Sequence, residues 1–179
     1  MNTDTDTDTD TEQTHIIYIS VGSNVDKETH TKAGLQGMYQ TFGELTLSSV
    51  FESESVGFDG NNFYNLVVKA RTKLSIDEVC RVLKKIEQEN KRQRGEQKFA
   101  PRTLDLDLLL YDRQVTTHPI ALPRPEVLYN AFVLKPLAEI AADEVHPEVN
   151  QSYANLWQKY DKSQQKLWAI TFDWSPTSI

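Results

Sequence analysis

The strongest constraint on the fold is one short apolar segment that carries two aspartates, Leu104–Tyr111, with the sequence LDLDLLLY. Its length and its leucine content are typical of a β-strand. Because side chains alternate along a strand, we expect one buried face made of four leucines, Leu104, Leu106, Leu108 and Leu110. The opposite face begins with Asp105 and Asp107 and continues with Leu109 and Tyr111. It changes from polar to apolar along the strand, as expected where a strand borders a cleft.

The two aspartates indicate a metal site. At the strand rise, their Cβ atoms are about 6–7 Å apart on one face. Mg²⁺ takes one or two carboxylates and keeps its other positions for water and phosphate oxygens, and two such ions can clamp an in-line displacement. An edge strand with solvated aspartates is the other interpretation. The pattern favours the metal site, because aspartate is depleted in strands and a pair there is costly without a partner.

A group of basic residues precedes this strand, namely Lys91, Arg92, Arg94, Lys98 and Arg102. Arginine makes bidentate contacts with phosphate, and lysine acts as a point charge. A solvated basic loop is the plain alternative, but Arg102 follows Pro101 and is therefore held near the aspartates. Gly95–Lys98 is predicted to form a mobile lid over a substrate. The whole segment is typical of a site for a magnesium-bound polyphosphate.

The segment before the basic loop, Ser75 to about Lys91, is predicted to be a helix. Ser75 and Glu78 match the S-x-x-E capping box, and the apolar residues that follow have helical spacing. Glu87 lies one turn after Leu83, so its carboxylate should point toward the sheet. Taken alone, that position suggests a salt bridge, with Arg92 as the candidate partner.

Composition limits the classes of function. Residues 1–14 form an acidic Asp/Thr tail that we expect to be disordered, and residues 15–179 fit one domain. The tail holds five of the acidic residues that give the net charge of −7, so the remainder carries −2. A local basic cluster in a nearly neutral domain suits a small anionic ligand and argues against a nucleic-acid surface. We find no membrane span and no secretory signal, and the single cysteine, Cys80, cannot form an internal disulfide, so we predict a cytoplasmic protein. We also expect a monomer.

The order of predicted elements defines the fold class. Through Tyr111 it is strand, helix, strand, strand, helix, strand, which is the ferredoxin-like βαββαβ pattern. We therefore predict an α+β sandwich with helices on one face of an antiparallel sheet. Later elements are a proline-stiffened loop around Arg124, a helix that starts only after Pro136, and a last strand over residues 167–174.

Asn65 is an unexpected residue in the predicted strand Phe63–Arg71, because asparagine disfavours strands. Its amide offers donors and an acceptor that suit the edge of a heterocycle. A structural role in fixing the preceding loop is equally compatible with the sequence.

Three segments carry a resemblance to a known family: PRTLDLDLLLY, YISVGSN at residues 18–24 and AFVLKPLAEIA at residues 131–141. In this order they closely resemble 6-hydroxymethyl-7,8-dihydropterin pyrophosphokinases, over about residues 15–147. The resemblance implies the ferredoxin-like fold and a reaction of folate biosynthesis. That reaction transfers the β,γ-pyrophosphate of ATP to the hydroxymethyl group of a reduced pterin and releases AMP.

The resemblance also assigns roles to residues. Two Mg²⁺ ions would lie on Asp105 and Asp107, and Arg92 and Arg102 would offset charge on the transferred group. ATP would contact Glu87, Arg92, Arg94, Lys98, Arg102 and Arg124. The pterin would contact Ser53, Val56, Asn65, Phe99 and Phe132, with the ring of Phe132 stacked on it.

The chain departs from the family pattern at several of these positions. Arg124 and Pro125 stand where the family usually has a histidine and often an aromatic residue, and Asn130 stands where an arginine is common. Phe99 replaces a tryptophan of the basic loop, and Ser53 begins a Ser-Glu pair where the family has Thr-Pro. These departures leave a divergent paralogue, with an altered substrate or no activity, as an alternative.

Two other classes of protein share single features with this chain. The Asp-x-Asp strand also occurs in metal-dependent nucleotide-sugar transferases, but that interpretation leaves Asn65 and the basic loop unexplained. A ferredoxin-like RNA-binding module would need exposed aromatics on one face, whereas Phe63 and Tyr64 fall on opposite faces of their strand.

Overall fold

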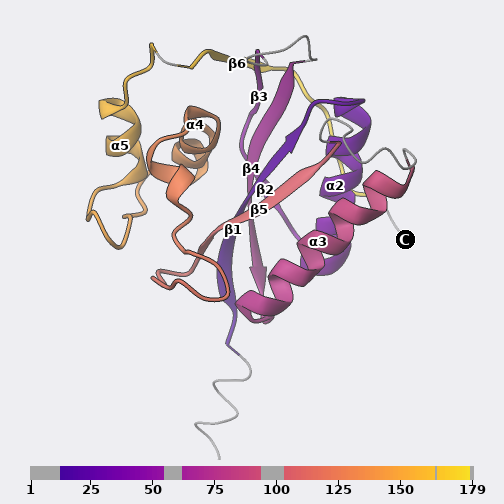
Figure 1. Ribbon diagram of the computed structural model, residues 1–179, viewed down its shortest axis with the longest axis horizontal. Helices are drawn as coiled ribbons and strands as arrows, with labels where there is room; N and C mark the ends of the chain where they lie inside the picture. Colours follow the sequence, from indigo (N-terminus) through magenta and orange to yellow (C-terminus); the bar gives the residue numbers. More distant parts are fainter. Residues whose placement is uncertain (1–12, 55–61, 94–102, 164, 178–179) are drawn as a thin grey trace, which may run out of the picture.

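A six-stranded antiparallel sheet forms the centre of the structure, which is a computed structural model (Figure 1). It describes residues 13–54, 62–93, 103–163 and 165–177, with only the backbone for residues 91–93. The strand order is β5-β1-β4-β3-β6, and β2 also pairs with β4. In chain order, the elements are β1 (His15–Ser23), α2 (Lys27–Phe42), β2 (Thr46–Leu47), β3 (Val50–Ser53), β4 (Phe63–Thr72), α3 (Ile76–Gln93), β5 (Asp105–Tyr111), η1 (Pro125–Leu128), α4 (Ala131–Ile140), α5 (Tyr153–Lys159) and β6 (Leu167–Ile170).

The predicted capping box starts α3. The Ser75 N–H donates to Glu78 Oε1 at 2.9 Å, and the Glu78 N–H donates to Ser75 Oγ at 3.2 Å. The other helix on this side, α2, packs closely on its neighbours through glycine. A Cβ atom on Gly34 would lie only 3.1 Å from both methyl carbons of Leu104. These contacts bring α2 and α3 onto the sheet beside the start of β5.

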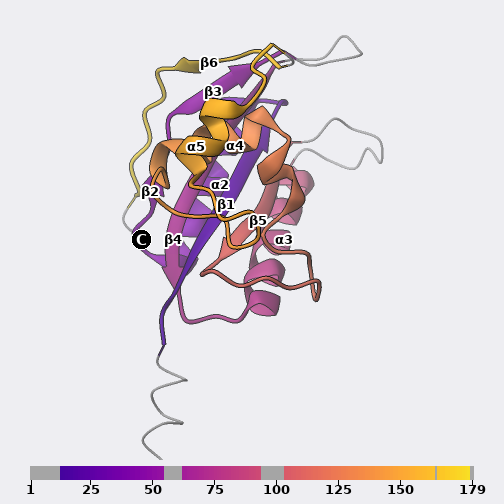
Figure 2. The same ribbon diagram turned by 90° about the vertical axis from the view of Figure 1, so that its left-hand side faces the viewer.

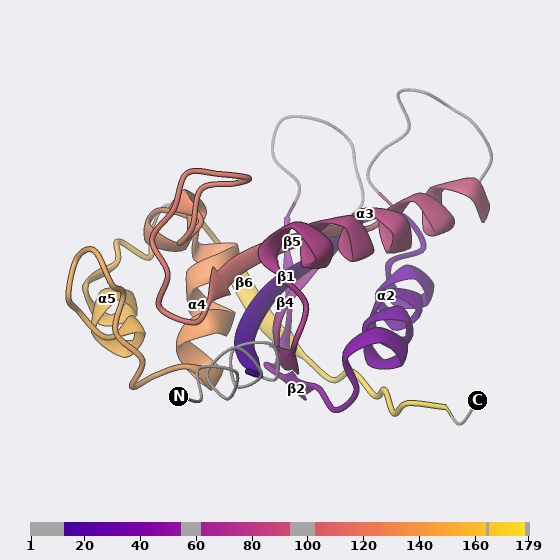
Figure 3. The ribbon, with the colours of Figure 1, turned by 90° about the horizontal axis from the view of Figure 1, so that it is seen from below.

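Helices cover both faces of the sheet (Figure 3). One core joins α2 and α3 to residues such as Ile19 and Leu66, and the other joins α4 and α5 to Tyr18 and Val67. The prediction of helices on one face is therefore correct for the βαββαβ part and wrong for the rest. The reason is that β1 and β4 are apolar on both of their faces, so each face needs a cover.

A register shift in β5 changes the predicted alternation. Ile19 pairs with Leu108 and Tyr18 pairs with Leu110, so Leu109 is the extra residue of a β-bulge. After the bulge, Leu110 faces the α4 side together with Leu109, and Tyr111 faces the α2 side. The predicted faces are correct up to Leu109 and reversed for Leu110 and Tyr111.

The C-terminal part differs from the prediction at one helix. α4 begins at Ala131, before Pro136, because Asn130 caps it and accepts the Phe132 N–H at 2.9 Å. Pro136 removes only one intrahelical donor, and Leu134 and Leu137 hold the helix in the second core. The predicted last strand exists over Leu167–Ile170, where β6 pairs with β3 at the edge of the sheet (Figure 2). Among the described residues, no helix combines the length and apolar character needed to cross a membrane.

Candidate active site

Three neighbouring strands form the floor of a cavity on the α4 side of the sheet. Gly22 of β1 pairs with Asn65 of β4 on one side and with Asp105 of β5 on the other. Directly paired residues point to the same face, so an aspartate and an asparagine flank a glycine. At about 4.8 Å between strands, the two polar residues lie roughly 10 Å apart. The predicted metal and heterocycle residues thus belong to one cavity.

Asp107 lies one row further along this floor and is paired with Arg124. Arg124 Nη2 donates to Asp107 Oδ1 at 2.9 Å. Burial raises the pKa of the Asp107 carboxyl, the positive charge of Arg124 opposes that rise, and the neighbouring Asp105 adds to it. The second aspartate therefore stays half-buried with its charge balanced by an arginine.

The loop that carries Arg124 is attached to the strand of the aspartates. The Arg124 N–H donates to the Leu109 carbonyl at 2.9 Å, at the bulge of β5. Arg124 Nε is buried and has no hydrogen-bond partner among the described residues. Because Arg124 lines the same cavity as Asp105 and Asp107 and its side chain is partly exposed, its guanidinium can also contact an anion that enters this cavity.

Glu87 points toward the sheet, as predicted, and its described contact is with the backbone of β5. Its Oε2 accepts the Leu106 N–H at 2.7 Å. Leu106 lies between Asp105 and Asp107 on an edge strand, where backbone donors lack a partner strand. Glu87 therefore holds the part of β5 that carries Asp105 and Asp107 in place. Its predicted salt bridge to Arg92 involves a side chain outside the described residues.

Three of the predicted pterin residues, Ser53, Asn65 and Phe132, lie at the other end of the floor. Asn65 Nδ2 donates to Ser53 Oγ at 3.4 Å, and Ser53 is fully buried on β3. Phe132, in the first turn of α4, lines the same cavity as Asn65, and so does Phe63. Two of these residues come from the sheet and one from the helix that covers it.

Part of the predicted site lies outside the described residues. This applies to Arg94, Lys98, Phe99, Arg102 and Val56, and to the side chain of Arg92. Their predicted roles remain predictions.

Sequence reasoning missed the contribution of Gly22 to the floor. Gly22 lies within β1, which continues through Ser23. A Cβ atom on Gly22 would lie 3.2 Å from Asn65 Oδ1. The absence of a side chain therefore keeps the floor open, and only the strand register reveals this.

The residues present fit magnesium. Two carboxylates lie on one face of β5 beside a cavity, and Mg²⁺ needs no more protein ligands when a phosphate supplies the rest. Within the described residues, no group of three or more His, Cys, Asp or Glu could hold a metal by itself. A closed structural metal site is a poorer fit to this donor set than a metal shared with a substrate.

The comparisons with known proteins agree with this geometry. The family model for 7,8-dihydro-6-hydroxymethylpterin-pyrophosphokinase (HPPK) matches residues 18–142. A 2-amino-4-hydroxy-6-hydroxymethyldihydropteridine pyrophosphokinase of Bacillus subtilis is 33% identical over 154 residues, which cover 81% of this chain and 92% of the relative.

The chain belongs to the HPPK family. An Aquifex aeolicus pyrophosphokinase is 34% identical over 73% of this chain and 83% of its own length. The HPPK assignment supports pyrophosphate transfer to hydroxymethyldihydropterin in folate synthesis, with ATP as co-substrate. Neither the nucleotide-sugar transferase nor the divergent paralogue gains support from these relatives.

Solved structures confirm the fold. A Plasmodium falciparum HPPK-DHPS structure superimposes with a TM-score of 0.67 at 13% sequence identity. The match covers 82% of this chain and 44% of that longer chain. At this identity the likeness shows the α+β HPPK fold, and this chain spans less than half of the fused protein.

Proposed function

We propose that this HPPK-family chain depends on magnesium and transfers pyrophosphate along the floor described above. Two Mg²⁺ ions would bind at Asp105 and Asp107, and the reduced pterin would lie against Asn65. The observation that carries the proposal is the row Asp105–Gly22–Asn65, which sets a metal-suited carboxylate and a heterocycle-suited amide on one face. Gly22 leaves the space between them open for the reacting groups.

At the metal end, bound magnesium would neutralise charge on the triphosphate and lower the pKa of the attacking hydroxyl, and Asp105 and Asp107 would hold it. Asp105 and Asp107 fix the position of the charged groups because Glu87 holds the strand between them through the Leu106 N–H. Arg124 balances Asp107 in the free protein and lines the cavity that a phosphate would enter. Positioning and electrostatics of this kind supply most of the catalysis in phosphoryl-group transfer.

The remaining nucleotide contacts follow from the family resemblance. Arg92 and Arg102 would offset charge on the transferred pyrophosphate. Arg94 and Lys98 would reach it from the basic loop, and Glu87 would lie beside the nucleotide.

At the pterin end, the Asn65 amide would bind the polar edge of the heterocycle. Ser53 restricts the amide's rotation, because its Oγ accepts from Nδ2. The Phe132 ring would stack on the pterin, an arrangement in which an aromatic side chain adds to the burial of apolar area. Phe99 and Val56 would complete this end of the site.

The decisive experiment measures AMP release from ATP in the presence of hydroxymethyl-dihydropterin and Mg²⁺. Asp105→Asn and Asp107→Asn should each abolish pterin-dependent AMP while the far-ultraviolet circular dichroism stays unchanged. Asp143→Asn, at an exposed turn after α4, is the matched control and should behave as wild type. Undiminished turnover in either of the first two variants, or turnover in the presence of EDTA, would remove the metal assignment.

We also propose that the domain acts as a cytoplasmic monomer and that the acidic tail takes no part in the reaction. Light scattering after gel filtration tests the monomer. Deletion of residues 1–14 should leave the KM for both substrates unchanged.

A further inference from the structure

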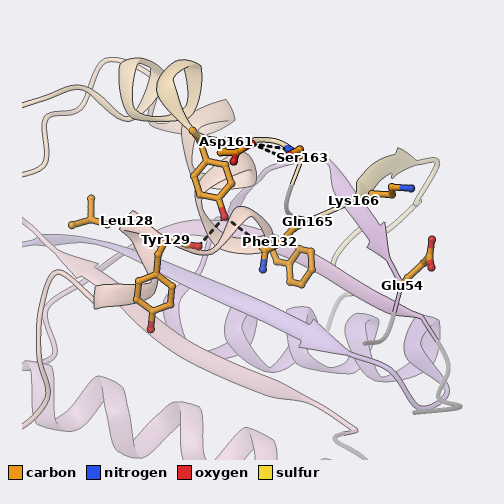
Figure 4. Close-up of a pocket in the computed structure, with 9 residues that line it drawn as sticks. Glu54, Leu128, Tyr129, Phe132, Asp161, Ser163, Gln165 and Lys166 are labelled. Carbon is orange, nitrogen blue, oxygen red and sulfur yellow. Dashed lines mark hydrogen bonds between the residues drawn. The ribbon is translucent and has the colours of Figure 1, made fainter. Parts of the chain in front are cut away.

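Two side chains near the C-terminus, those of Tyr160 and Gln165, bind to the backbone at the start of α4. Gln165 Oε1 accepts the Ala131 N–H at 2.6 Å. The Tyr160 hydroxyl lies 3.0 Å from the same oxygen and 2.8 Å from the Tyr129 carbonyl, so its single proton is shared between two acceptors (Figure 4). Both side chains lie beyond residue 142, where the family match ends.

These bonds satisfy backbone donors that a helix cannot satisfy by itself. The first four N–H groups of an α-helix have no intrahelical partner. In α4, the Ala131 N–H is bound by Gln165 and the Phe132 N–H by Asn130 Oδ1 at 2.9 Å. The orientation of the turn that carries Phe132 therefore depends on a side chain from the end of the chain.

Phe132 lies between two cavities. One is the cavity of Asp105 and Asn65, and the other is a larger cavity that Tyr129, Gln165 and Lys166 line (Figure 4). Phe132 is only partly buried and lines both cavities, so its ring lacks the close packing that fixes a core aromatic. Its position must be set largely by its backbone.

The chain after Gln165 also contacts β3, the strand that carries Ser53. Two residues after Gln165, Leu167 pairs with Ser53, the residue that accepts from Asn65. Gln165 and Leu167, only two residues apart, thus contact the start of α4 and the end of β3. Asp105 and Asp107 are held instead by β1, Glu87 and Arg124.

We propose that Gln165 and Tyr160 are positioning residues of the pterin subsite, which fix Phe132 through the first turn of α4. The inference rests on the proposed function, because it takes Phe132 as a pterin contact. Loss of these bonds should weaken pterin binding and leave nucleotide binding unchanged. A general loss of folding would affect both.

The test measures the affinity for hydroxymethyl-dihydropterin by calorimetry, with a nonhydrolysable ATP analogue and Mg²⁺ present, and the KM for each substrate. For Gln165→Ala we expect a roughly tenfold rise in the pterin Kd and KM, about the effect of one lost hydrogen bond to a positioning group. The KM for ATP should stay within about twofold. Tyr160→Phe should show a smaller rise, because the Ala131 N–H keeps its acceptor.

Two variants separate positioning from a purely structural effect. Gln165→Glu keeps the acceptor, and a carboxylate is favourable at a helix N-terminus, so it should restore pterin affinity. Gln158→Ala, on the exposed side of α5, is the matched control and should behave as wild type. An unchanged pterin Kd in Gln165→Ala, or equal changes in the KM of both substrates, would overturn the inference. If the wild-type protein itself bound no pterin, the proposed function would fail first.

Discussion

Replacement of Gly22 by alanine should damage catalysis while the fold remains stable. The new Cβ atom would lie 3.2 Å from Asn65 Oδ1, a few tenths of an ångström closer than ordinary contact. The Asn65 amide would have to move, and its bond to Ser53 is already 3.4 Å long, with no length to spare. The methyl group would also stand on the floor between Asn65 and Asp105, where the proposal places the reacting groups.

The expected magnitude follows from hydrogen bonding at the pterin edge. Leaving one buried polar partner unsatisfied costs about 1–3 kcal/mol, which corresponds to a loss of roughly 5- to 150-fold in kcat/KM for the pterin. Stability should change little. Alanine reduces the conformational entropy of the unfolded chain, which stabilises the fold by about 0.4–1 kcal/mol and offsets the cost of the close contact. We therefore expect a Tm within about 4 °C of wild type.

Gly34→Ala provides the matched control for this change. Its Cβ atom would meet the Leu104 methyl carbons at 3.1 Å, an equally close contact, but in the core between α2 and the sheet. This variant should alter the Tm and leave the KM for pterin unchanged. Steady-state kinetics with both substrates and thermal unfolding are measured for each variant. A folded Gly22→Ala protein with wild-type kcat/KM would refute the assignment of this floor to the reaction.

Three further changes test the surroundings of the site. Arg124→Ala removes the positive charge that opposes the effect of burial on the pKa of Asp107. The pKa of Asp107 should rise, and the acid limb of the pH–rate profile should move to higher pH. An unmoved limb would contradict the ion pair between Arg124 and Asp107. Glu87→Leu leaves the Leu106 N–H without its acceptor and should cost about 1.5–3 kcal/mol in urea unfolding, whereas Glu87→Gln should cost less; equal losses would contradict the role of the acceptor. Burial lowers the pKa of His146 in the folded protein below the ordinary value of about 6.5. Below about pH 6.5 the unfolded chain therefore binds a proton at His146 more readily than the folded protein does, and the free energy of unfolding should fall as the pH drops. Unfolding measured from pH 5 to 8 should show this fall in wild type and a flatter curve in His146→Asn.

The polar residues of the site could be predicted from the sequence because each breaks a local rule. Asp105, Asp107 and Asn65 are residues that strands disfavour, and the period of two placed them on faces that the structure confirms. The capping box likewise fixed the start of α3, which carries Glu87. These are signals that act within a few residues.

What the sequence did not reveal depends on contacts between distant segments. The bulge at Leu109 exists because β5 pairs with β1 in a shifted register, and the prediction for Leu110 and Tyr111 was wrong for that reason. α4 and α5 cover the second face of the sheet because β1 is buried on both of its faces. A short hydrophobic run in the sequence does not show by itself whether one face or both faces of a strand are buried. Gly22 belongs to the site only through the two residues that pair with it.

The departures from the family pattern form a connected set in the structure. Arg124 replaces a usual histidine, and Asn130 replaces a common arginine, yet both line one cavity. Arg124 places its guanidinium 2.9 Å from Asp107, while Asn130 serves α4 as its N-cap. Relative to the common pattern, the chain has therefore moved a positive charge from the helix start to the loop that is bound to β5. The charge stays in the cavity, and the first turn of α4 gains a neutral cap. This combination favours an active enzyme over a divergent paralogue that has lost its phosphate site.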